Sequence, residues 1–214
     1  MILSICVFLT RGKFLTGFLS ENPISNRYIN KGIRRSIGGI TVEQRKITHI
    51  CDKAVTAYAK GDSEALSVIY DCMAKMIMAT ALAITDSRED AEDVLQDTMI
   101  VVARFAGNYQ KGTNAKAWIL AIARNKALDL VRKRNRNLPL DEAGDMPEAE
   151  KGFEGLEVMD MLKILDETER QLILFRLYTG LSYKEISIIM EISVAAAQKR
   201  YQRAIAKLRE SEGL

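Results

Sequence analysis

The strongest structural constraint in this sequence is a helical period that runs along the chain from about Thr48 onward. Apolar residues recur at three- and four-residue steps, the spacing that places side chains on one face of an α-helix. Residues 48–60 and 63–84 are predicted to be two helices that pack as a hairpin around Gly61 and Asp62. Only three of the 214 residues are prolines, and 48% are apolar. The pattern therefore predicts an all-α protein with substantial hydrophobic cores.

A third helix is predicted to begin after Asp86 or Ser87, because either residue can cap a first helical turn. Its apolar stripe comprises Val94, Leu95, Val101, Val102 and Phe105. Its other side, which we call the acidic face, comprises Asp90, Asp93, Gln96 and Asp97. From these residues alone, the acidic face is either a solvated surface or a docking site for a basic partner.

A fourth helix is predicted from the stretch AKAWILAIARNKALDLVRKR, residues 115–134. The side chains expected to point into the core are Trp118, Ile119, Ile122 and Val131, whereas another side carries Lys116, Leu120 and Arg124. The end of the helix is strongly basic, since residues 123–136 contain six cations and only one acid, Asp129. Cations favour the negative end of a helix dipole. Four of them at positions 132–136 exceed what capping needs, which indicates contact with a polyanion.

Two segments lack a helical period. Residues 1–46 form an extension that we expect either to be poorly packed or to precede the true start of translation. Its apolar run is too short to span a membrane, which needs roughly 20 apolar residues, so no stable membrane insertion is expected. Residues 137–156 hold two prolines and many acids and predict a flexible acidic linker. The linker would separate a helical domain, 47–136, from a second domain, 157–214.

The second domain contains two sequence signatures of helix starts. Asp166 with Glu169, and Ser182 with Glu185, each fit a capping box. The second box is followed by a short helix to about Met190, a break of three residues, and a longer helix from residue 194. This is the spacing of a helix-turn-helix.

The last helix has two faces of different character. The face predicted to be buried comprises Val194, Ala197, Tyr201, Ile205 and Leu208, and the opposite side carries Ala196, Lys199, Arg203 and Lys207. From residue 193 to 209 there are five cations and no acid. In a helix-turn-helix the second helix enters the major groove, where Lys and Arg reach phosphates and guanine edges. We therefore predict DNA binding, against the alternative of a solvated amphipathic helix that closes a bundle.

Charge and composition exclude several other classes of protein. The formal net charge is +3, but beyond residue 46 there are 23 cations and 26 acids, so any affinity for nucleic acid must come from local patches. His49 is the single histidine, and Cys6, Cys51 and Cys72 match neither a zinc site nor a secreted disulfide pattern. No metal, cofactor or catalytic constellation is predicted, and a reducing cytosol is the simplest location.

Three segments in this order resemble a bacterial RNA polymerase sigma factor of the small, two-domain extracytoplasmic-function type. They are DAEDVLQDTMIVVAR (90–104), AKAWILAIARNKALDLVRKR (115–134) and LDETERQLILFRLYTGLSYKEISIIMEISVAAAQKRYQRAIAKLRE (165–210). The resemblance covers roughly residues 48–211. It implies that the chain is not an enzyme but selects promoters and opens DNA for the core polymerase.

The resemblance assigns expected roles to the first domain. The acidic face would dock on the β′ clamp of the polymerase. The loop and helix start at 107–116 would capture a flipped base of the minus-ten element, and the basic helix would contact the DNA backbone. The expected minus-ten and backbone contacts are Asn108, Tyr109, Lys111, Asn114, Lys116, Arg124, Lys126, Arg132, Lys133, Arg134 and Arg136.

The helix-turn-helix would read the minus-thirty-five element and touch the β flap. Its expected DNA contacts are Ser193, Ala196, Lys199, Arg200, Gln202, Arg203 and Lys207. Most relatives place a glycine where this chain has Glu191, and a left-handed backbone there would cost a non-glycine residue about 1–2 kcal/mol. The alanines at 195–197 offer no hydrogen bonds to bases, so direct readout shifts toward Lys199, Arg200, Gln202 and Arg203.

The resemblance also implies partners and a location. The expected partners are core polymerase, promoter DNA and an anti-sigma factor. The free chain is expected to be a monomer in the cytoplasm. The acidic linker would thread the RNA exit path of the polymerase. Two alternatives stay open: a helix-turn-helix regulator that does not bind core polymerase, and a helical enzyme with a DNA-binding tail.

Overall fold

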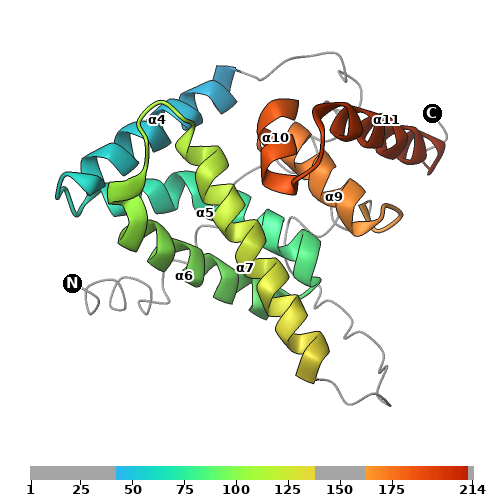
Figure 1. Cartoon of the computed structure of the whole chain (residues 1–214), viewed down its shortest axis with the longest axis horizontal. Coiled ribbons are helices and arrows are strands. Elements are labelled where there is room, and N and C mark those ends of the chain that lie inside the picture. Colours follow the sequence, from blue (N-terminus) through green and yellow to red (C-terminus); the bar gives the residue numbers. More distant parts are fainter. Residues whose placement is uncertain (1–41, 138–161, 212–214) are drawn as a thin grey trace.

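The computed structural model describes residues 42–137 and 162–211 (Figure 1). Every regular element in these two ranges is a helix, so the prediction of an all-α fold is confirmed. Most of the predicted extension, and the predicted linker from residue 138, lie outside the described residues.

The first group of helices is built around one central helix. Its members are α4 (Val42–Ala59), α5 (Ala65–Thr85), α6 (Arg88–Phe105) and α7 (Ala115–Asn137), and α5 contacts the other three. Ile69, Met73 and Ile77 of α5 are fully buried. A helix that is apolar on most sides is stable in water only when neighbours cover it. By length and composition α5 is also the one described helix suited to cross a membrane, but 61% of that stretch is buried inside the protein.

The first helix of this group begins earlier than predicted, at Val42 rather than at about Thr48. The five residues VEQRK at 42–46 have no clear apolar period, so they gave no helical signal. A distant contact helps to hold this turn in place: the side-chain amide of Gln44 donates hydrogen bonds to the carbonyls of Leu177 and Tyr178, at 3.2 and 3.3 Å.

The junction between α5 and α6 settles which residue caps α6. Ser87 has an extended backbone, and its hydroxyl accepts a hydrogen bond from the Asp90 N–H at 3.2 Å, so Ser87 is the cap. Asp86 instead ends α5 in a left-handed conformation, with φ of 52°. The predicted break between α4 and α5 is also present, and Gly61 takes a positive φ of 101° there.

The second group comprises α9 (Glu167–Ile173), a π-helical turn η2 (Leu174–Tyr178), α10 (Tyr183–Met190) and α11 (Val194–Ser211). Both predicted capping boxes are confirmed, Asp166 with Glu169 and Ser182 with Glu185. The helix-turn-helix is formed by α10 and α11, which contact each other and pack beside α9 and η2. The break of three residues between them is as predicted.

The buried face of α11 differs from the prediction at one position. Ala197, Tyr201, Ile205 and Leu208 are buried as expected. Val194 was expected to be buried but is 41% exposed, because it is the first residue of the helix, next to the turn.

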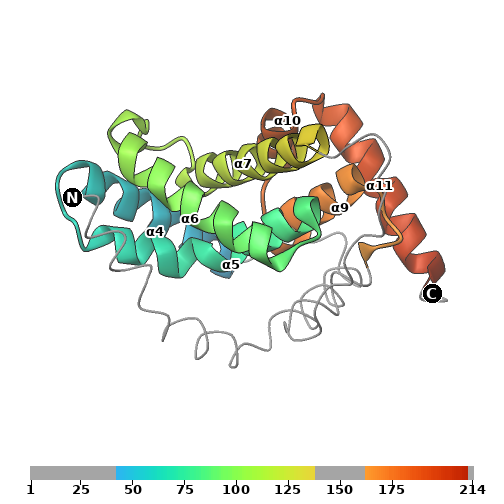
Figure 2. The ribbon, with the colours of Figure 1, turned by 90° about the horizontal axis from the view of Figure 1, so that it is seen from below.

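The two groups of helices pack against each other (Figure 2). Helix α9 and η2 contact α5, and α10 contacts α7. This contact covers the side of α7 that was expected to face away from the core, so that Lys116 and Leu120 are buried. Trp118 is only half-buried, as are Ile122 and Val131, whereas Ile119 is fully buried as predicted.

Candidate nucleic-acid interface

The C-terminal end of α7 presents a cluster of exposed cations. They lie within five positions near the end of the helix and comprise Arg132, Lys133, Arg134 and Arg136. The Arg132 side chain is 71% exposed and lies 3.5 Å from Asp129 on the same helix. Ion pairs between exposed side chains contribute little stability, about 0–1 kcal/mol. These cations are therefore free to exchange their present partners for phosphates.

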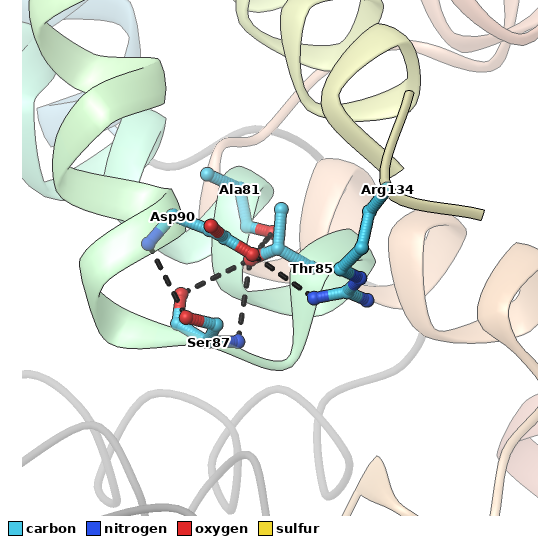
Figure 3. Close-up of polar contacts among 5 residues, drawn as sticks. All are labelled: Ala81, Thr85, Ser87, Asp90 and Arg134. Carbon is cyan, nitrogen blue, oxygen red and sulfur yellow. Dashed lines mark hydrogen bonds and ion pairs between the residues drawn. The ribbon is translucent and has the colours of Figure 1, made fainter. Parts of the chain in front are cut away.

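One of these cations joins the end of α7 to the start of α6 (Figure 3). Arg134 donates to the Asp90 carboxylate at 3.0 Å, while the Asp90 N–H donates to the Ser87 hydroxyl. The Thr85 hydroxyl lies 3.1 Å from the carbonyls of both Ala81 and Ser87 and shares its one proton between them, which fixes the turn between α5 and α6. The helix start is thus held from both sides, and Asp90 is only partly accessible.

The rest of the acidic face is open. Asp93, Gln96 and Asp97 are exposed along one side of α6. Asp97 also lies 3.4 Å from Lys126 of α7, so a second ion pair bridges the acidic face and the basic helix. One turn further along α6, Ile100 is 48% exposed. The surface therefore combines carboxylates with an accessible apolar side chain, which suits a protein partner.

The loop between α6 and α7 is held by a residue of α4. The Asp52 carboxylate accepts hydrogen bonds from the Tyr109 hydroxyl at 2.5 Å and from the Ala115 N–H at 2.7 Å, both on the same oxygen. The Tyr109 ring also packs against Trp118, with ring centres 5.5 Å apart. Burial, and secondly the hydrogen bond to Asp52, raise the pKa of the Tyr109 hydroxyl to about 12. Asn108 and Lys111 are exposed on this loop.

Three of the predicted DNA contacts lie in the contact between the two helical groups. Lys116 is 1% exposed, and its ammonium donates to the Thr179 carbonyl at 2.7 Å. Arg124 donates to the Gln171 side chain at 2.8 Å and to the Ile189 carbonyl at 3.3 Å.

The third such residue is Asn114, whose side-chain amide donates to Glu185. Burial lowers the pKa of both Lys116 and Arg124, against opposing carboxylates that raise it. In this arrangement none of the three is available to DNA, because each donates its hydrogen bonds to the second helical group.

The exposed face of α11 carries most of the residues predicted to read DNA. Lys199, Gln202 and Arg203 are exposed, and Arg200 and Ala196 are half-buried. The Ser193 hydroxyl caps the helix by accepting from the Ala196 N–H at 3.1 Å. Lys207 differs from the others, since its ammonium lies 2.7 Å from the buried carboxylate of Glu169 and links α11 to α9.

Glu191 has the left-handed backbone that the resemblance to sigma factors suggested, with φ of 54° and ψ of 41°. It ends α10, and its N–H donates to the Ile188 carbonyl. The turn therefore has the left-handed backbone expected for a glycine at this position, although the residue here carries a side chain.

Comparison with known proteins decides the family. The model of Sigma-70 region 2 matches residues 69–137, and that of Sigma-70, region 4 matches residues 155–208. The chain is 32% identical over 130 residues to RNA polymerase sigma factor CarQ of Myxococcus xanthus, an alignment that covers 58% of this chain and 75% of CarQ. It is 30% identical over 148 residues to ECF RNA polymerase sigma factor SigE of Mycolicibacterium smegmatis, covering 64% of this chain and 57% of SigE.

The chain belongs to the extracytoplasmic-function (ECF) type of the sigma-70 family. A solved structure agrees with this assignment. Sigma factor RpoE of Bartonella quintana, in complex with the anti-sigma factor NepR, has a TM-score of 0.53 and 26% identity, and covers 64% of this chain and 89% of RpoE. Sigma factors are transcription initiation factors rather than enzymes, and this chain is a promoter-recognising sigma factor.

The matched regions correspond to the two helical groups of the sigma factor. Region 2 covers most of α5 and all of α6 and α7, and region 4 covers α9 to α11 as far as Leu208. Helix α4, which holds the loop before α7, precedes the match to region 2.

Several residues that shape this surface carried no signal in the sequence. Gln44 and Asp52 on α4, and Gln171 and Thr179 in region 4, all contact residues far away along the chain. Glu185 was identified as part of a capping box but not as the partner of Asn114. The short polar motifs that sequence reasoning uses cannot report such contacts, because their partners are set by helix packing.

Proposed function

We propose that this sigma factor docks on core RNA polymerase through the acidic face of α6 and contacts promoter DNA through α11, the loop at 107–116 and the basic end of α7. The domain division at 47–136 and 157–214 is part of this proposal. The observation that carries it is the presence of two exposed surfaces of opposite charge on separate helical groups, the acidic face and the face of α11 around Lys199 and Arg203.

The physical roles follow from the chemistry of each surface. A carboxylate-rich helix face is complementary to a basic clamp surface, whereas exposed Lys and Arg neutralise phosphates. In the major groove, Lys199, Arg200 and Arg203 would reach guanine edges, and Gln202 would reach adenine. Phosphate contacts from Lys126 and from the cations at 132–136 would hold DNA without choosing its sequence. Catalysis belongs to the core polymerase.

Further parts of the proposal concern location and partners. The protein would act in the cytoplasm, as a monomer when free, and would contact the β flap of the polymerase through region 4. It would also bind an anti-sigma factor, as RpoE of Bartonella quintana binds NepR. Asn114, Lys116 and Arg124 could reach DNA only after regions 2 and 4 separate, since region 4 holds them in the present arrangement.

The first prediction tests promoter reading by α11. Replacing Lys199 and Arg203 by alanine should abolish promoter-specific run-off transcription from genomic DNA while leaving pull-down of core polymerase unchanged, because both side chains are exposed and outside the core. The matched control removes two exposed cations, Lys53→Ala on α4 with Lys60→Ala in the turn that follows it, and should transcribe normally. Retained initiation by the α11 variant would contradict the assignment.

The second prediction tests docking on the polymerase. Charge reversal by Asp93→Lys with Asp97→Lys should remove most core association in a pull-down, since like charges would then face each other across the interface. Glu64→Lys with Asp71→Lys makes the same change of charge on exposed positions elsewhere and should bind core normally. Undiminished binding by the Asp93/Asp97 variant would contradict docking through the acidic face, and the polymerase contact would then lie on another surface of the sigma factor.

A further inference from the structure

The loop between α6 and α7 is closed at both ends by a single carboxylate oxygen from another helix. Asp52 lies on α4 and accepts hydrogen bonds from the Tyr109 hydroxyl and the Ala115 N–H, at 2.5 and 2.7 Å. Tyr109 follows the short 3-10 helix η1 (Ala106–Asn108), and Ala115 is the first residue of α7. Both ends of the loop are therefore fixed to one point on α4.

The segment between these two anchors is accessible and has a defined shape. Gln110, Lys111 and Thr113 are exposed, and the Thr113 hydroxyl donates to the Gln110 carbonyl at 2.7 Å, closing a turn. Gly112 occupies this turn with φ of 91°, a left-handed conformation that glycine adopts without strain. The loop is thus a shaped, exposed surface between two fixed ends.

The electrostatics of the Asp52 contact favour its persistence. The Ala115 N–H is one of the N–H groups at the start of α7 that have no partner within the helix. A carboxylate placed there satisfies the donor and lies at the positive end of the helix dipole. Asn114 caps the same helix by accepting from the Ala117 N–H at 3.2 Å, so the two side chains together fix where α7 begins.

The second anchor sets the orientation of an aromatic ring. Because the hydroxyl of Tyr109 is bound by Asp52 and its ring packs on Trp118, the ring has little freedom to turn. A base that leaves the DNA stack costs a few kcal/mol to unpair, and a pocket recovers this cost only if it is already formed. If the loop became ordered only when the base bound, part of the binding free energy would be lost to the conformational entropy of the loop.

We propose that Asp52 is the positioning residue of the base-capture loop, and that it acts by holding Tyr109 and the start of α7 at fixed positions so that an unpaired base is received. This inference rests on the proposed function, which assigns the loop at 107–116 to the minus-ten element. It adds a residue of α4 that lies outside the matched region 2, and its proposed role is to hold the loop rather than to contact DNA.

The experiment uses the full chain bound to core polymerase. The probe is a promoter fragment that the wild-type protein transcribes in a run-off assay, with 2-aminopurine placed in turn at each position of the nontemplate minus-ten strand. A base flipped out of the stack fluoresces more strongly. Asp52→Ala should reduce this signal and the rate of strand opening about tenfold, because both anchors are lost. Core pull-down and protection of the minus-thirty-five region should stay at wild-type levels.

Two further variants separate positioning from general stability. Asp52→Asn keeps an oxygen that accepts both hydrogen bonds and should retain at least about half of the signal. Tyr109→Phe keeps the ring but loses one anchor, and should give a signal between those of wild type and Asp52→Ala. Asp71→Ala, at an exposed position of α5, is the control for loss of one acid.

Three results would overturn the proposed role of Asp52. Wild-type fluorescence from Asp52→Ala would overturn the inference while leaving the proposed function intact. Should Asp52→Ala fail to fold, Tyr109→Phe decides instead, and an unchanged signal from it would overturn the inference. If no template supports initiation by the wild-type protein, the proposed function fails, and this inference fails with it.

Discussion

At the scale of single residues, Glu191 is a position where backbone and side chain conflict. Its φ of 54° places a non-glycine residue in the left-handed region. There the Cβ approaches the carbonyl oxygen at a cost of about 1–2 kcal/mol. Glu191→Gly should therefore raise the free energy of unfolding by about 1 kcal/mol, after allowance for the greater freedom of glycine in the unfolded chain. The midpoint of urea unfolding measures this change.

Glu191→Ala is the matched control, since it removes the same carboxylate but keeps the Cβ. Its stability should stay within about 0.5 kcal/mol of wild type, as is usual for exposed positions. An equal gain from both variants would show that the charge, and not the backbone, limits stability at this turn.

Residue contacts were predictable where they are local in the sequence. Both capping boxes join residues three positions apart, so Asp166 with Glu169 and Ser182 with Glu185 could be read directly. Asp52 could not be assigned in this way, because its partners Tyr109 and Ala115 are brought to it only by the packing of α4 against the start of α7 and the preceding turn.

At the scale of helices, Lys207 is a cation that forms an ion pair between two packed helices, although the sequence predicted it to contact DNA. Its ammonium lies 2.7 Å from the carboxylate of Glu169, which is 6% exposed. Lys207→Met should lower the free energy of unfolding by about 1–2 kcal/mol, because a buried carboxylate loses its partner although nearby solvent screens part of the effect. Urea unfolding measures the loss.

Lys199→Met is the control for Lys207→Met, since Lys199 is exposed on the same helix. It should change stability by less than about 0.5 kcal/mol while weakening DNA binding. If both variants were equally stable, the contact between Lys207 and Glu169 would not stabilise the packing of α11 against α9.

Helix periodicity predicted where the helices lie in the sequence, but not all of the residues that they bury. Most of the apolar stripe of α6 and of the buried face of α11 followed from spacing, since a helix buries the side that is apolar. The stripe of α6 was wrong toward its end, where Val101 is only half-buried and Phe105 is 43% exposed. The start of α4 and the buried side of α7 did not follow, because Gln44 and Lys116 are polar residues held by carbonyls of region 4. A lysine whose ammonium finds a carbonyl partner can be buried, and sequence patterns do not show the partner.

At the scale of the whole molecule, polar contacts between regions 2 and 4 depend on a few cations. Lys116→Ala with Arg124→Ala removes donors to Thr179, Gln171 and Ile189. The free protein should then become more extended, because carbonyl and amide groups at the interface would be left without partners. Small-angle scattering of the full chain would show this as a larger radius of gyration.

The control for this change removes two cations from the exposed end of α7, Lys133→Ala with Arg136→Ala. That variant should keep the wild-type radius of gyration, since neither side chain lies between the regions. An unchanged radius in the Lys116/Arg124 variant would show that these two cations are not needed to hold regions 2 and 4 together.

The ion pairs between α6 and α7 connect two binding surfaces thermodynamically. Arg134 with Asp90, and Lys126 with Asp97, each join a proposed DNA contact to a proposed polymerase contact. A polymerase surface that engages the carboxylates would release the cations, and phosphates that engage the cations would release the carboxylates. Each partner then strengthens binding of the other by the same factor, as linkage requires. For exposed pairs worth about 0.2–1 kcal/mol each, that coupling is modest but reciprocal, and it favours assembly of the three-part complex over either two-part complex.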